Sequence, residues 1–123
     1  MADSKAEEYM EERLELAFLY DFYGALLKEK QQRIFEASVL EDYNFSEIAQ
    51  DMGITRQGVH DGVKRACMNL HKYEEKLGLA KKFKHQKELV KRLNEELSGM
   101  GISKQDEKWK VVFEILDDIL EEE

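Results

Sequence analysis

Apolar residues recur every three or four positions along most of this chain, which is the spacing of one face of an α-helix. From Glu7 to Leu27 the pattern predicts a helix that is buried on much of its circumference. Its stripe consists of Met10, Leu14, Ala17, Phe18 and Phe22, widened by Leu16, Leu19, Tyr20 and Tyr23. A second helix is predicted from Lys28 to Leu40, and the EDYN that follows supplies the Asp and Asn of a turn.

The next stretch, NFSEIAQDMGITRQGVHDGVKR at positions 44–65, predicts two helices joined by a sharp turn. Ser46 can accept a hydrogen bond from the free amides of a short helix that runs to about Met52, and Thr55 can do the same for the next helix. Gly53 lies between the two helices and tolerates a positive φ at no steric cost.

Two such helices form a helix-turn-helix, in which the first helix packs across the second. Ala49 supplies the small residue that is needed where the two backbones approach. The inner faces would bury Ile48, Met52, Ile54, Val59 and Val63. The start of the second helix, the recognition helix, would expose Thr55, Arg56, Gln57, His60, Asp61 and Lys64. Arg and Gln side chains can each form two hydrogen bonds to a base edge, whereas an Asp would repel phosphate.

The apolar pattern continues to the end of the chain. It falls at Val59, Val63, Ala66, Leu70, Tyr73 and Leu77, which predicts one helix of about five turns. Gly78 is expected to cap that helix, and the run from Leu79 to Leu97 predicts another, as a hairpin partner or a bent continuation. Ser98–Ser103 is predicted to be a loop before a last acidic helix with a stripe from Trp109 to Leu120. The chain is therefore predicted to be all-α, with six helices and no strand.

We expect one domain with an appendage. Residues 1–97 would form a helix-turn-helix domain, with the motif proper at 45–70 followed by a basic helix. Residues 98–123 would form the loop and the acidic C-terminal helix. The apolar face of that helix must be buried, either against its own core or against a second copy of the chain. A homodimer would suit a helix-turn-helix protein, since these commonly present two recognition helices.

Composition supports a helical protein of the cytosol. The 123 residues are 42% apolar, include no proline, and are enough for a single buried core. Cys67 is the only cysteine, which excludes an intramolecular disulfide and fits a reducing compartment. The opening MADSKAEEYMEERLELAF is too acidic for a signal peptide, and no apolar run approaches the ~20 residues that span a bilayer. We therefore expect a cytoplasmic protein without membrane insertion.

The formal net charge of −8 conceals an uneven distribution. Residues 1–63 carry 6 basic and 14 acidic side chains, and residues 93–123 carry 3 and 10. Residues 64–92 carry 10 basic and 3 acidic side chains, a local charge of +7. This basic segment begins within the predicted recognition helix, where a nucleic-acid footprint is expected. The alternative is that it forms the solvated face of an amphipathic helix.

The sequence offers no residue set for catalysis or for a metal. His60, His71 and His85 are separated by 11 and 14 positions, unlike helical ligand pairs three or four apart. Cys67 lies beside the apolar stripe with no histidine placed to activate it, so a buried thiol is expected. Carboxylate pairs occur in runs that coat solvated faces, and the glycines of SGMGIS lack the lysine of a phosphate loop. We expect neither an enzyme nor a cofactor.

The stretch FSEIAQDMGITRQGVHDGVKR, with YDFYGALLKEKQQRIFEASVLEDY before it and LHKYEEKLGL after it, resembles the YlxM-type family of small bacterial proteins. Members of that family have a helix-turn-helix similar to region 4 of sigma factors, and the resemblance covers roughly Tyr9 to Leu79. Their genes lie beside those of the signal recognition particle GTPase and its receptor. The resemblance implies a sigma-region-4-like, winged-helix-free fold and an accessory or regulatory role in that targeting pathway.

Two features depart from the resemblance. Family members usually have larger residues than glycine at two positions of the recognition helix, where this chain has Gly58 and Gly62. Each glycine costs roughly 0.5 to 1 kcal/mol relative to alanine in a helix interior, so loosely ordered first turns are expected. Such turns argue against base-specific reading by Gln57 or His60. Lys28 stands where the family tends to place a threonine cap.

The leading hypothesis is a non-enzymatic protein that binds DNA or the RNA of the signal recognition particle. Contacts are expected from Thr55, Arg56, Gln57, His60, Lys64 and Arg65. Phosphate neutralisation is expected from Lys72, Lys76, Lys81, Lys82, Lys84 and Lys87. One rival is a protein-interaction adaptor that engages a basic partner, such as a targeting GTPase, through the acidic ends Glu7–Glu15 and Asp117–Glu123. A second rival is a promoter-binding transcription regulator.

Overall fold

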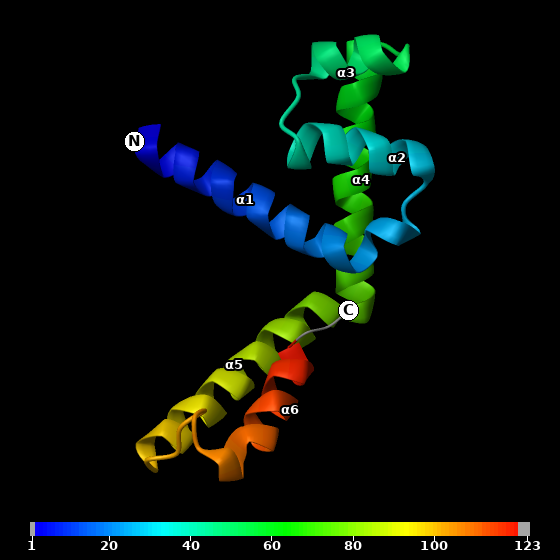
Figure 1. Ribbon diagram of the computed structural model, residues 1–123. Helices are drawn as coiled ribbons and strands as arrows, with labels where there is room; N and C mark the ends of the chain where they lie inside the picture. The colour runs from blue at the N-terminus through cyan, green and yellow to red at the C-terminus, as the bar shows by residue number, and fades with distance from the viewer. Residues whose placement is uncertain (1, 121–123) are drawn as a thin grey trace. The chain divides into compact units, whose positions relative to one another are not determined.

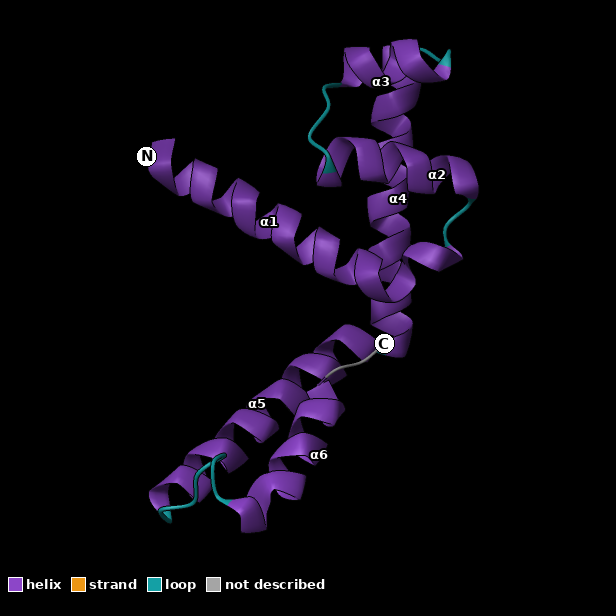
Figure 2. Cartoon of the chain, viewed as in Figure 1, coloured by secondary structure: helices purple, strands orange, loops and turns teal. Residues whose placement is uncertain are grey.

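The computed structural model describes the backbone of residues 2–120 and the side chains of residues 11–120. Over that backbone every regular element is helical, which confirms the all-α prediction (Figures 1 and 2). The α-helices are α1 (Ala2–Tyr23), α2 (Glu29–Phe35), α3 (Phe45–Met52), α4 (Arg56–Leu77), α5 (Leu79–Gly99) and α6 (Lys110–Leu120). Three short elements accompany them: the 3₁₀ turns η1 (Gly24–Leu26) and η3 (Glu107–Trp109), and the π-helical turn η2 (Glu36–Leu40).

The chain divides into two compact units, Met1–Ala80 and Lys81–Glu123. In the first unit α4 is the central helix, and α1, α2 and α3 cross it at successive levels along its length (Figure 1). One buried cluster joins α1 and α2 to the middle and end of α4 through Leu19, Tyr23, Phe35, Ala66 and Leu70. A second cluster joins α2 and α3 to the start of α4 through Ile34, Ile48, Ala49 and Val59.

The helix-turn-helix consists of α3 and α4, as the sequence predicts. Gly53 ends α3 in the left-handed conformation with a φ of 68°, and Thr55 caps α4 by accepting a 2.9 Å hydrogen bond from the Gly58 amide. The inner faces are those expected, because Ile48 and Val59 are buried and three further residues pack against them: Met52, Ile54 and Val63. The end of α3 at Met52 is also confirmed.

The predicted cap of α3 was wrong. Asn44, rather than Ser46, precedes the helix, and its side-chain oxygen accepts a 2.9 Å hydrogen bond from the Glu47 amide. The Glu47 carboxylate accepts a 3.1 Å hydrogen bond from the Asn44 amide in return, which completes a capping box. Ser46 lies inside the first turn and is exposed. Both residue types favour caps, and the reciprocal Glu47 bond decides between them.

The helix predicted for Glu7–Leu27 is α1 followed by η1, and its predicted stripe packs in the core at Phe18 and Phe22 but not at Leu14. Leu14 is 65% exposed, whereas Leu19 and Tyr23 are completely buried. The core therefore uses the residues that widened the stripe, because α1 meets α4 only along its second half (Figure 1). The side chain of Met10 lies outside the described residues.

The helix predicted for Lys28–Leu40 is interrupted. α2 ends at Phe35, and η2 continues with a hydrogen bond of 2.8 Å from the Glu41 amide to the Glu36 carbonyl, five residues back. A hydrophobic pattern of period 3.6 does not distinguish such a turn from an α-helix. The expected turn follows, and Asp42 adopts a φ of 60° within it.

The long helix α4 ends where predicted, at Gly78 with a φ of 62°. Its stripe is buried at Val59, Ala66 and Leu70, but Leu77 is 55% exposed. Buried Tyr23 stabilises this end of the helix. Its hydroxyl donates a 2.6 Å hydrogen bond to Glu74 and accepts a 3.0 Å hydrogen bond from the Leu79 amide. Burial and the Glu74 carboxylate raise the pKa of Tyr23 above its ordinary value, so the hydroxyl remains protonated.

In the second unit α6 runs back along α5 (Figure 1). Val90 and Leu97 of α5 pack with Phe113 and Leu116 of α6 in a separate buried cluster. The last helix therefore buries one face within its own unit, while its opposite face leaves Val111, Ile115 and Ile119 exposed. The boundary between the two compact units falls after Ala80 in the sequence, and α5 packs with α6 within the second unit. The predicted division into domains at residue 97 stays a prediction.

Candidate nucleic-acid interface

The first three turns of α4 present the predicted recognition residues to solvent. Thr55, Arg56, Gln57, His60, Lys64 and Arg65 are all exposed. They are exposed because Val59, Val63 and Ala66 take the inward positions of the helix, at a spacing of four and then three. The intervening polar residues therefore reach solvent, with His60 beside Phe45 of α3 and Arg65 beside the start of α2.

Three of the outward residues interact with one another. Gln57 Nε2 donates a 3.0 Å hydrogen bond to Asp61 Oδ1, one helical turn later. His60 Nδ1 lies 3.6 Å from the same oxygen, and the His60 ring meets Phe45 of α3 edge-on with centroids 6.0 Å apart. Asp61 thus orients the Gln57 amide and lies on the face that would meet a polyanion. This geometry favours backbone contacts by the neighbouring cations over bidentate base reading by Gln57.

The remaining predicted lysines are distributed over both units. Lys72 and Lys76 are exposed farther along α4, and their spacing from Arg65 of seven and then four places the three side chains on one helix face. Lys81, Lys82, Lys84 and Lys87 are exposed on α5 and belong to the second unit. The Lys87 ammonium lies 5.9 Å from the centroid of the Phe83 ring. The structure therefore brings together the α4 residues on one helix of the first unit, and the four α5 lysines are described with the second unit.

Two basic residues that the sequence analysis did not select lie beside the recognition helix. Lys28 and Lys30, at the start of α2, line a cleft of about 380 Å³ together with Arg65 of α4. The other residues that line it are Gln31, Ile34, Gly58, Asp61 and Gly62. The spacing KEK marks Lys28 and Lys30 as a basic pair in the sequence, but only the packing of α2 on α4 places them opposite Arg65.

Gly62 explains how α2 and α4 approach so closely. A Cβ atom at this position would lie 2.7 Å from Cδ1 of Ile34, a side chain that is only 2% exposed. Gly62 therefore fits an interhelical contact, in addition to being the weak helix former that the sequence suggests.

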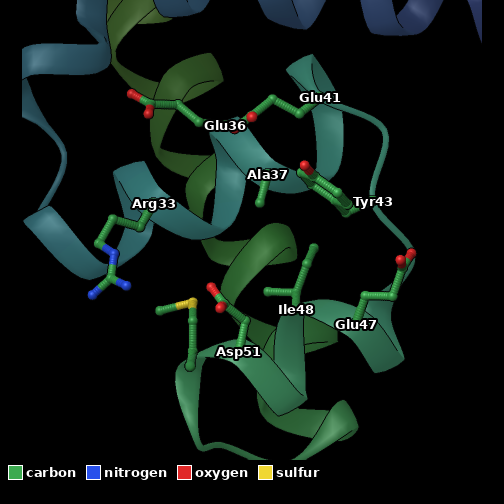
Figure 3. Close-up of a pocket in the computed structure, with 9 residues that line it drawn as sticks. Arg33, Glu36, Ala37, Glu41, Tyr43, Glu47, Ile48 and Asp51 are labelled. Atoms are coloured by element: carbon green, nitrogen blue, oxygen red, sulfur yellow. The ribbon is translucent and has the colours of Figure 1, made fainter.

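A second hollow, which we call the acidic pocket, lies between α2, η2 and α3 (Figure 3). It has a volume of about 500 Å³. Its lining consists of Arg33, Glu36, Ala37, Glu41, Tyr43, Glu47, Ile48, Asp51 and Met52. Four carboxylates against one guanidinium make this side of the first unit unsuited to a polyanion.

Cys67 is half-buried, and its burial followed by the charge of Glu12 raises the pKa of its thiol, which makes it a poor nucleophile at neutral pH. Among the described residues, no three His, Cys, Asp or Glu side chains are grouped so that they could hold a metal ion. The helices of the described region are also too short or too polar to cross a bilayer.

Comparison with known proteins identifies relatives over nearly the whole chain. Residues 10–112 match the model of the UPF0122 family, whose description is "Putative helix-turn-helix protein, YlxM / p13 like". The UPF0122 protein YlxM of Bacillus subtilis (strain 168) is 38% identical over 108 residues, covering 88% of this chain and 96% of that protein. A UPF0122 protein of Thermoanaerobacter sp. (strain X514) is 43% identical over 107 residues, covering 87% and 89%.

Proposed function

This chain belongs to the UPF0122 family of YlxM/p13-like helix-turn-helix proteins, and on that premise we propose that it binds nucleic acid in the cytoplasm. The observation that supports this function is the exposure of Arg56, Lys64 and Arg65 on the first three turns of the recognition helix. The family description names a helix-turn-helix protein rather than an enzyme, in keeping with a binding role.

In the proposed complex, phosphate groups contact the cations of α4, and Lys72 and Lys76 extend the contact along the same helix. Each neutralised phosphate releases counterions, so affinity falls steeply with salt. A DNA duplex would receive the start of α4 in its major groove. An RNA helix would be recognised through its shape and backbone, because its major groove is too narrow for side chains to read.

The resemblance to YlxM-type proteins supports a more specific proposal, in which the ligand is the RNA of the signal recognition particle. The protein would then be an accessory or regulatory component of that targeting pathway. Recovery of bound partners from cell lysate with and without ribonuclease tests this role. Loss of the particle's RNA and protein together after ribonuclease treatment would support it, and recovery of neither would contradict it.

The contribution of the recognition helix is tested by the triple variant Arg56→Ala, Lys64→Ala, Arg65→Ala. The matched control is Lys104→Ala, Lys108→Ala, Lys110→Ala, which removes the same charge from exposed residues of the second unit. We expect the first variant to weaken binding of a labelled duplex at least about tenfold and to flatten its salt dependence. Equal affinities for the wild type and the first variant would reject the proposal.

A second candidate is an adaptor that binds a protein through an inherited helix-turn-helix scaffold. The observation in its favour is the Gln57–Asp61 hydrogen bond, which holds a carboxylate on the recognition face. The same triple variant would then leave protein partners bound, whereas reversing the charges of Asp117 and Asp118 at the acidic C-terminal end would release them. Promoter binding, the third hypothesis, predicts that deoxyribonuclease rather than ribonuclease releases the ligand.

We also propose a homodimer formed through the second unit. Val111, Ile115 and Ile119 follow one another at a spacing of four on the outer face of α6 and are 63%, 54% and 40% exposed. Ile115→Lys should convert the dimer to a monomer in sedimentation equilibrium. A wild-type chain that sediments as a monomer at high concentration would contradict the dimer.

A further inference from the structure

The cleft between the starts of α2 and α4, which we call the basic cleft, combines three cationic side chains that come from two helices. Lys28 and Lys30 approach it from α2 and Arg65 approaches it from α4. All three residues are exposed, and no ion pair among residues 11–120 engages any of them. Their charges are therefore available to a ligand that enters the cleft.

Among the described residues that line the basic cleft, Asp61 is the only acidic one. Its Oδ1 atom accepts the hydrogen bond from Gln57 Nε2 and lies 3.6 Å from His60 Nδ1. These two neighbours occupy one side of the Asp61 carboxylate. With three cations and one carboxylate, the basic cleft retains a formal charge of about +2 and attracts anions.

The floor of the basic cleft contains Gly58 and Gly62, so no side chain from these two positions covers the helix backbone. The Ile34 side chain occupies the space beside Gly62, because its Cδ1 atom lies 2.7 Å from the place of a Cβ there, so the attraction for an anion comes from the cationic side chains. The volume of about 380 Å³ corresponds to roughly a dozen water molecules at about 30 Å³ each. A phosphate group fits this space together with waters that bridge it to the surrounding side chains.

We propose that the basic cleft binds one phosphate group between Lys28, Lys30 and Arg65. The planar guanidinium of Arg65 can donate two parallel hydrogen bonds to phosphate oxygens. The two ammonium groups act as compact charges whose donors can rotate toward the remaining oxygens. The inference rests on the proposed function where that phosphate belongs to a polynucleotide backbone. In that case α2 fixes the register of the recognition helix, because phosphate contacts orient a protein on its nucleic acid.

Binding of phosphate itself is measured by titrating the wild-type protein with inorganic phosphate and following the backbone amides by nuclear magnetic resonance. We expect saturable shifts of the Gly58 and Gly62 amides, while those of Gly99 and Gly101 in the second unit remain in place. The variant Lys28→Ala, Lys30→Ala should lose the saturable shifts, and Lys28→Arg, Lys30→Arg should retain them.

Binding of a backbone phosphate is measured with a labelled duplex and a labelled RNA hairpin. We expect Lys28→Ala, Lys30→Ala to weaken binding about tenfold, as the loss of one charge-assisted hydrogen bond predicts, and to reduce the salt slope by about 0.7 to 0.9. The control Lys108→Ala, Lys110→Ala removes the same charge elsewhere and should change affinity less than twofold. Lys28 forms no side-chain cap for α2, so its replacement removes no capping bond.

The two titrations identify the source of the phosphate. The basic cleft would be assigned to a small phosphate compound if inorganic phosphate shifts the Gly58 and Gly62 amide signals while the alanine variant binds duplex and RNA normally. Weakened polynucleotide binding would assign it to a backbone phosphate. The proposal is overturned if the glycine amides do not shift and the alanine variant binds nucleic acid like its control. Failure of the wild type to bind nucleic acid would reject the proposed function. The amide shifts of Gly58 and Gly62 with inorganic phosphate would still show whether the basic cleft binds phosphate.

Discussion

The segment from Lys28 to Glu41 lines two hollows of opposite character. The basic cleft, which it shares with the start of α4, has three cations and a floor of two glycines. The acidic pocket, which it shares with α3, has four carboxylates and a floor of apolar side chains (Figure 3). One helix and its continuation therefore present an anion-attracting surface and an anion-repelling surface within the same compact unit.

This difference shows why a net charge of −8 does not exclude a polyanionic ligand. At physiological ionic strength exposed charges farther apart than about 8 Å are largely screened from one another, so a ligand responds to the nearest charges. The acidic pocket then acts mainly on orientation, because it disfavours any arrangement that places a phosphate backbone over α3.

The apolar floor of the acidic pocket is part of the helix-turn-helix core. Replacing a residue of this floor should therefore cause the largest change in stability. Ile48 is 3% exposed and packs with Ile34 and Val59, so Ile48→Ala should lower the free energy of unfolding by about 2 to 5 kcal/mol. Urea denaturation measures the loss. The exposed Lys30→Ala at the basic cleft is the matched change and should stay within about 0.5 kcal/mol of the wild type. A similar loss of unfolding free energy for both variants would contradict the claim that the acidic pocket, unlike the basic cleft, rests on the core at Ile48.

The glycine floor of the basic cleft predicts an intermediate effect. Gly62→Ala should destabilise the protein by about 1 to 3 kcal/mol, because the new methyl group overlaps Cδ1 of Ile34. Ile34→Val removes that atom, so the double variant should be more stable than the sum of the two single losses predicts. Denaturation of the four proteins in a double-mutant cycle measures the coupling. An increase in stability for Gly62→Ala alone would show that helix propensity outweighs packing at this site.

The capping box beside the acidic pocket predicts a smaller effect. Asn44→Ala should cost about 1 kcal/mol, since it removes the acceptor for the Glu47 amide. Ser46→Ala is the matched control within the first turn of α3, and it should change stability by less than about 0.5 kcal/mol. Thermal denaturation distinguishes the two variants. A greater loss for Ser46→Ala would restore the cap expected from the sequence.

The smallest effect concerns the charge of the acidic pocket. Glu41→Gln with Asp51→Asn should raise the affinity for a labelled duplex by about two- to threefold, because screened repulsion from this side is weak. Lys28→Glu with Lys30→Glu changes the charge of the basic cleft in the opposite sense and should lower affinity by much more. Effects of equal size would mean that the ligand responds to net charge rather than to either hollow.

The bounds of α4 were predictable because local residues determine them. Thr55 caps its start, Gly78 takes the left-handed conformation at its end, and Val59 lies on its inner face by helical periodicity alone. The exposure of Arg56 and Lys64 follows from the same periodicity. For this reason the predicted recognition residues of α4 emerge together on the surface.

Features that depend on tertiary packing were not predictable. Leu14 fits the helical stripe as well as Leu19 does, and only the point at which α1 crosses α4 decides which is buried. The sequence treats Gly62 as a weakness of the recognition helix, whereas the structure places it against Ile34 and in the floor of the basic cleft. The role of Lys28 is likewise visible only once α2 is packed against α4.

The central claim is that this acidic chain binds a polyanion through a local cluster of cations. Its most direct test is the dissociation constant of the wild-type protein for a labelled duplex and for a labelled RNA hairpin, measured across a series of salt concentrations. With two to five or so phosphates neutralised at about 0.7 to 0.9 each, a plot of log association constant against log salt should have a slope between about −1.4 and −4.5 for at least one ligand. Absence of binding, or binding that does not change with salt for both ligands, would contradict the claim.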